Sequence, residues 1–93
     1  MRLNPTEREI IKQAIAGMDP HARIYLFGSR VDDSGRGGDI DLLIFSERLG
    51  ATDRFSLRAE IFKHIEEQKL DLLIVKDESD PFVQLVMKEA VPL

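Results

Sequence analysis

Three aspartates in this chain have the residue type and the spacing that could do chemistry. Asp39 and Asp41 are one residue apart where an apolar run begins, and Asp71 stands near the start of a later apolar run. Side chains of a strand alternate between its two faces, so Asp39 and Asp41 should point the same way, about 6–7 Å apart. The pattern predicts a pair of carboxylates at the start of a buried strand.

The elements around these aspartates predict that all three meet. Short β-branched, aromatic and leucine-rich runs are typical of strands, here over residues 23–27, 40–45 and 70–75. Helical spacing and capping residues predict helices from Pro5 to about Gly17, from Thr52 or Asp53 onward, and from Pro81 to about Ala90. The strand–helix–strand crossover favours parallel pairing of the second and third strands, which puts Asp71 beside Asp39 and Asp41.

The expected fold is α/β, with a small mixed β-sheet of about three strands flanked by helices. If the first two strands run antiparallel, the end of the first strand brings Gly28 and Ser29 to the edge that holds the aspartates. A chain of 93 residues without a repeat or a low-complexity tract predicts a single domain over residues 1–93.

Carboxylates gathered at one edge of a sheet destabilise the folded protein unless a cation binds to them. Like charges repel and each carboxylate loses water, and a hard cation offsets both effects. Mg²⁺ takes oxygen ligands, and two ions about 3.5–4 Å apart can clamp the oxygens of a phosphoryl displacement. Glycines such as Gly28 and Gly38 let backbone N–H groups approach an anion, and Arg30 and Arg36 suit a triphosphate. The residues therefore indicate a metal-dependent nucleotide site.

The motif FGSR…GGDIDLLI, followed by LDLLIV, resembles the minimal nucleotidyltransferases of the DNA polymerase β superfamily. Their pattern is Gly-Ser, a short spacer, Asp-x-Asp, and a third acidic residue on a later strand. The resemblance implies that Gly28 and Ser29 bind the nucleotide phosphates, and that Asp39 and Asp41 bind both metals. It also implies that Asp71 ligates one metal and acts as the general base toward the attacking group.

Two neighbouring residues complete the expected nucleotide site. Arg30 follows the Gly-Ser pair, and Gly38 directly precedes the first aspartate. Many relatives have serine at the position of Gly38, so this chain lacks a hydroxyl there. The difference bears on how the substrate is held and leaves the expected metal ligands unchanged.

The resemblance implies transfer of AMP from ATP to a hydroxyl, with two Mg²⁺ ions and release of pyrophosphate. The chain is too short to include the helical domain that holds the acceptor in larger relatives, so the acceptor is expected on a partner protein. Similar small proteins are antitoxins of helical HEPN-type ribonuclease toxins. The alternative is a non-catalytic, nucleotide-binding antitoxin that neutralises its partner by contact.

Composition restricts the class of protein. The chain has a net charge of −4, so strong nucleic-acid binding is not expected. No apolar run approaches the length of about 20 residues that a membrane span needs, and the polar amino-terminal residues do not resemble a signal peptide. The absence of cysteine is compatible with the cytoplasm, where we expect the protein to reside.

Plainer interpretations of the same residues stay open at this point. Asp39 and Asp41 could be solvated charges at a strand end, Asp71 could be a turn residue, and the glycine-rich stretch could be only a connecting loop. The last helix carries more apolar residues than one buried stripe needs. Val83 and Met87, with Val91, are expected to form an exposed apolar patch that supports a partner or a homo-oligomer.

Overall fold

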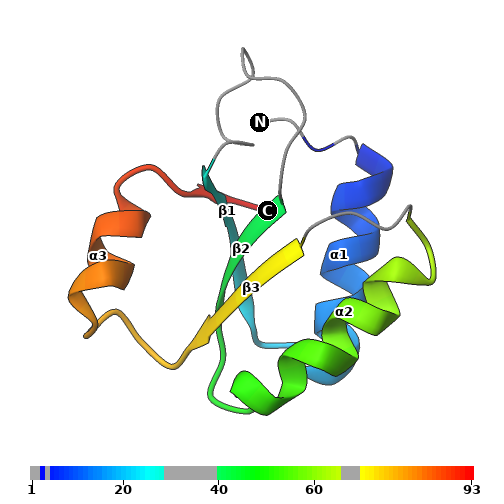
Figure 1. Cartoon of the computed structure of the whole chain (residues 1–93), viewed down its shortest axis with the longest axis horizontal. Helices are drawn as coiled ribbons and strands as arrows, with labels where there is room; N and C mark the ends of the chain where they lie inside the picture. Colours follow the sequence, from blue (N-terminus) through cyan, green and yellow to red (C-terminus); the bar gives the residue numbers. More distant parts are fainter. Residues whose placement is uncertain (1–2, 4, 29–39, 66–69) are drawn as a thin grey trace.

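The computed structural model describes residues 3, 5–28, 40–65 and 70–93. A sheet lies between two helical layers, with α1 and α2 on one side and α3 on the other (Figure 1). The elements follow the chain in the order α1 (Pro5–Met18), β1 (Arg23–Phe27), β2 (Ile40–Phe45), the 3₁₀ turn η2 (Ala51–Asp53), α2 (Arg54–Phe62), β3 (Leu70–Val75), α3 (Pro81–Met87) and β4 (Val91–Pro92).

The sheet has four strands in the order β3-β2-β1-β4, one more than expected. β2 and β3 are parallel, whereas β1 is antiparallel to both β2 and β4, so the mixed sheet is confirmed. The additional strand β4 has only two residues and was too short to give a periodic pattern. Its Pro92 is tolerated because β4 lies at the edge of the sheet, where a missing N–H costs no ladder hydrogen bond.

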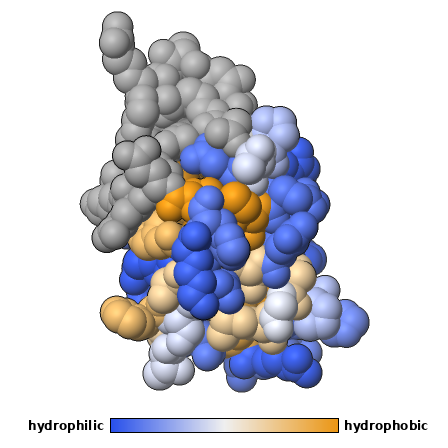
Figure 2. Space-filling view, turned by 90° about the vertical axis from the view of Figure 1, so that its right-hand side faces the viewer, coloured by the Kyte–Doolittle hydropathy of each residue, from blue (hydrophilic) through white to orange (hydrophobic). Residues whose placement is uncertain are grey.

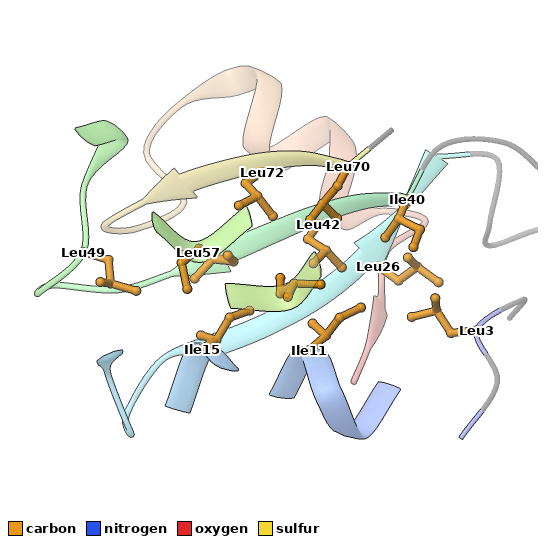
Figure 3. Packing of buried hydrophobic residues seen from close by; sticks show 12 residues of the cluster. Leu3, Ile11, Ile15, Leu26, Ile40, Leu42, Leu49, Leu57, Leu70 and Leu72 are labelled. Carbon is orange, nitrogen blue, oxygen red and sulfur yellow. The ribbon is translucent and has the colours of Figure 1, made fainter. Parts of the chain in front are cut away.

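The main core fills the space between the sheet and the helices α1 and α2 (Figure 3). Ile11 and Ile15 of α1 and Leu57 and Ile61 of α2 are fully buried there, as helical spacing predicts. The strands contribute alternate residues to the same cluster, namely Leu26, Ile40, Leu42, Ile44, Leu70 and Leu72. This core fixes which face of each strand is turned away from α1 and α2.

The outer surface of the α1 and α2 layer is mostly polar. Hydrophobic residues show between the hydrophilic ones on this side of the molecule (Figure 2). Phe55 of α2 is 79% exposed. Within the described ranges, no helix has the length and apolar character needed to span a membrane.

A smaller core lies under α3, and it corrects the expected patch on that helix. Val83 is 1% exposed and Met87 packs against the same cluster, so neither forms an exposed patch. The exposed apolar side chains of α3 are Phe82 and Leu85, at 54% and 61%. The phase of α3 is set by packing, because Val83 and Met87 fill the cluster on this face of the sheet. The start at Pro81 is as expected, and the Asp80 carboxylate caps the helix by accepting a hydrogen bond from the Phe82 N–H at 2.8 Å.

Two helix ends also differ from expectation. α1 continues past Gly17 and ends at Met18, so the glycine does not stop it. α3 ends at Met87 rather than near Ala90, and the chain then turns to pair β4 with β1. At α2 the expected cap Asp53 is present, but its carboxylate accepts from the Gly50 N–H at 2.8 Å instead of from the helix.

Candidate functional site

Asp41 and Asp71 lie side by side at the start of the two parallel strands. Each is the second residue of its strand, and the register of β2 and β3 pairs them directly. Neighbouring strands are about 4.8 Å apart, so the two Cα atoms are close neighbours. The parallel pairing expected from the strand–helix–strand order is therefore confirmed for these two residues.

Both carboxylates belong to the face of the sheet that α3 covers. Leu43 of β2 and Leu73 of β3 pack in the cluster under α3, and side chains two residues apart share a face. Asp41 and Asp71 precede these leucines by two positions. The main core on the other face therefore leaves the acidic pair accessible at the rim of the sheet.

The two carboxylates differ in exposure. Asp41 is half-buried in a central strand, whereas Asp71 is exposed on β3, which is the edge strand. The two carboxylates therefore suit different tasks, because only the exposed Asp71 can reach a reactant on a large partner. The arrangement places one fixed anion and one accessible anion next to each other.

The turn after β1 packs directly on Asp41. Phe27, the last residue of β1, is the antiparallel partner of Asp41, and Gly28 follows it with a φ of +77°. A Cβ placed on Gly28 would overlap the Asp41 carboxylate, with Cγ at 3.1 Å. Only glycine combines this left-handed conformation with this closeness of backbone to carboxylate. The sequence-based expectation that Gly28 meets the acidic rim is thus correct.

Arg58 is a residue of this site that the sequence analysis did not identify. Its Nε and Nη2 atoms donate to the carbonyl oxygen of Leu70 at 3.1 and 2.9 Å. That carbonyl belongs to the peptide unit that joins Leu70 to Asp71. Arg58 thus ties α2 to the start of β3 and fixes the backbone that carries Asp71. An arginine beside a buried helical stripe is common, so its sequence position gave no distinct signal.

The other expected site residues lie outside the described residues. These are Ser29, Arg30, Gly38 and Asp39. Among the residues that are described, no cluster of three or more His, Cys, Asp or Glu could hold a metal ion. Asp41 and Asp71 by themselves are a pair of oxygen donors of the kind that Mg²⁺ takes together with substrate phosphates. The donor chemistry therefore fits a hard divalent cation.

The comparison with protein families agrees with this geometry. The model of the family described as polymerase beta, nucleotidyltransferase matches residues 9–93 of the 93-residue chain. The chain belongs to this nucleotidyltransferase family, whose members generally use a nucleoside triphosphate and a divalent metal. A search of curated proteins found no match. The family defines nucleotidyl transfer as the general chemistry of this chain.

Proposed function

We propose that this chain transfers AMP from ATP to a hydroxyl group on a partner protein, a HEPN-type helical toxin. The observation that carries the proposal is the direct pairing of Asp41 with Asp71, next to a glycine turn that touches the Asp41 carboxylate. Family membership supports the transfer of a nucleotidyl group. The identities of the nucleotide and the acceptor are part of the proposal.

The proposed roles of the two described aspartates follow from their positions. Asp41, half-buried and held against Gly28, would ligate Mg²⁺ together with Asp39. Two Mg²⁺ ions, when bound, would neutralise charge on the triphosphate and on the attacking and leaving oxygens. Ser29, Arg30, Gly28 and Gly38 would hold the phosphates.

Asp71 would act as the general base and as a ligand to one ion. In the proposed reaction the acceptor oxygen forms a bond to the α-phosphorus, and the bond from that phosphorus to the bridging oxygen breaks. Pyrophosphate leaves, and the hydroxyl proton passes to the Asp71 carboxylate. The exposure of Asp71 on the edge strand supports an acceptor carried by another macromolecule, since a bulky group can approach from the open side.

A transfer assay tests this function. The protein would be incubated with Mg²⁺, ATP labelled on the α-phosphate and a candidate HEPN-type helical partner. Label on partner Tyr, Thr or Ser would then be measured. Asp71→Asn should bind the partner and ATP and transfer nothing. Asp77→Asn is the matched control at the other end of β3. The amide oxygen of the introduced asparagine can still accept a hydrogen bond from the Ser79 N–H, as the Asp77 carboxylate does at 3.0 Å. This control should transfer label normally.

The contact-only alternative gives a different result in the same assay. If neither the parent nor Asp71→Asn transfers label, and both neutralise the partner equally well, the enzymatic proposal is wrong. The protein would then act as a nucleotide-binding antitoxin by covering its partner. If label is transferred equally by the parent and by Asp71→Asn, the assignment of Asp71 as the base is wrong.

A further inference from the structure

A second charged site lies at the opposite end of the sheet from the acidic rim. There, a cavity of about 460 Å³ opens where β2 and β3 end and β1 begins. Phe45, which lines it, is four residues beyond Asp41, or about 13 Å along the strand. The volume lies in the range of about 300–1,000 Å³ that is typical of small-molecule sites.

Three cationic side chains line this cavity, from three different segments. Arg23 starts β1, Arg48 follows β2, and Lys76 follows β3. Among the residues that the structure describes, none of the three forms an ion pair. The whole chain has a net charge of −4, so this convergence of cations does not reflect a basic surface in general. Like charges brought together are unfavourable unless an anion binds between them.

Two carboxylates, Asp19 and Glu47, also line the cavity and offset part of its positive charge. Asp19 is only 5% exposed and its oxygens accept internal hydrogen bonds, from the Ser46 hydroxyl at 2.6 Å and the His21 N–H at 2.9 Å. These bonds hold the pKa of Asp19 below its ordinary value, the Ser46 bond being the larger cause. Glu47 is an exposed lining residue, so three cations face two carboxylates and leave one net positive charge in the cavity.

The cavity is held in shape before any ligand binds. The Ser46 hydroxyl is buried and accepts from the backbone N–H groups of Arg48 at 3.1 Å and Leu49 at 2.8 Å. These bonds fix the turn that carries Arg48. On the other side, the Arg23 guanidinium carbon lies 4.5 Å from the centre of the Phe45 ring. The Arg23 side chain and the backbone of the Arg48 turn are thus held by contacts that need no ligand, and Arg48 Nη1 donates to the Met18 carbonyl oxygen at 3.5 Å. Such order lowers the entropic cost of binding.

We propose that this cavity binds the phosphate group of a small anionic ligand. Arg and Lys side chains make charge-assisted hydrogen bonds to phosphate oxygens, and here three of them meet around one hollow. In open α/β sheets the space beyond the carboxyl ends of parallel strands is where ligands commonly bind, and β2 and β3 both end at this cavity. The ligand is either free inorganic phosphate or a phosphate ester of nucleotide size. The site is independent of nucleotidyl transfer at the acidic rim.

A titration followed by amide NMR tests the proposal on the intact chain. Inorganic phosphate and adenosine 5′-monophosphate would be added in separate series, both in EDTA, so that divalent-ion binding at Asp41 does not contribute. We expect saturable shifts confined to the amides from Ser46 to Leu49 and around Lys76. Tighter binding of the monophosphate would identify a phosphate ester as the ligand class, and equal binding would identify free phosphate.

Substitutions distinguish phosphate binding in the cavity from non-specific attraction of phosphate to exposed lysines. Lys76→Gln should weaken binding about tenfold, the effect of one charge-assisted contact. Arg48→Gln should do the same. Lys88→Gln, the same change at an exposed lysine outside the cavity, should leave the affinity unchanged. Absence of saturation with either probe, shifts spread over distant amides, or equal weakening by Lys76→Gln and Lys88→Gln would overturn the proposal. ATP binding with Mg²⁺ measured on Lys76→Gln reports on the other site separately.

Discussion

Replacing Gly28 with alanine perturbs the acidic rim by a single methyl group. The φ of +77° at this position is unfavourable for an L-residue, at a cost of about 1–2 kcal/mol in folding free energy. The new Cβ would also overlap the Asp41 carboxylate, whose Cγ lies 3.1 Å from the Cβ position. Either the turn or the Asp41 side chain must therefore move.

The two effects of Gly28→Ala give different measurable results. For a domain of this size, 1 kcal/mol corresponds to a change in melting temperature of about 4–8 °C. The melting temperature of Gly28→Ala should therefore fall by at least that amount. A displacement of a reacting group by about 1 Å costs about a hundredfold in rate. Transfer of labelled AMP should therefore fall about a hundredfold at a temperature where the variant is still folded.

Gly50→Ala is the matched control for this prediction. Gly50 has a φ of −136°, and a Cβ placed there meets nothing within 4 Å. This variant should keep both stability and transfer. If Gly28→Ala also keeps parental transfer and parental affinity for ATP with Mg²⁺, the contact between the Gly28 turn and Asp41 has no functional role.

Three further changes test other parts of the structure. Gly17→Ala, inside α1 with open space around the new methyl group, should stabilise the protein by about 0.5–1 kcal/mol in urea unfolding, and a loss of stability would contradict the helix assignment. Arg58→Lys keeps the charge but loses the paired donation to the Leu70 carbonyl, so it should lower the free energy of unfolding by about 1 kcal/mol and also reduce AMP transfer. An unchanged midpoint of urea unfolding would show that the contact between Arg58 and Leu70 does not stabilise the start of β3. The lowered pKa of Asp19 stabilises the fold above its ordinary value of 3.8, and this contribution disappears as pH falls through the lowered folded-state value. The stability gap between the parent and Asp19→Asn should therefore shrink below pH 3.8, and a gap that widens in acid would contradict it.

The sequence was informative where the signal is local or follows from chain order. The three longer strands have the expected bounds because each is a short apolar run bordered by polar residues. The pairing of Asp41 with Asp71 follows from the crossover rule, and the closeness of Gly28 follows from antiparallel pairing of β1 with β2. These arguments need only the order of elements and the alternation of side chains along a strand.

The features that sequence could not give depend on tertiary contacts. β4 is too short for a pattern and forms because the chain after α3 returns to β1. Which face of α3 is buried depends on packing against the sheet, so the wrong apolar residues were expected at the surface although the start of the helix was predicted correctly. The Arg58 contact and the three cations of the cavity join segments that are distant in the chain. Ser29, Arg30, Gly38 and Asp39 stay predictions.

Calorimetric titration with ATP, once with Mg²⁺ and once in EDTA, tests the central claim most directly. The claim is that carboxylates at the start of β2 and β3 form a metal-dependent nucleotide site. We expect the parent protein to bind ATP well only with Mg²⁺, and Asp41→Asn to lose that dependence together with the affinity while thermal unfolding shows that it is still folded. Equal ATP affinity in Mg²⁺ and in EDTA would contradict the account.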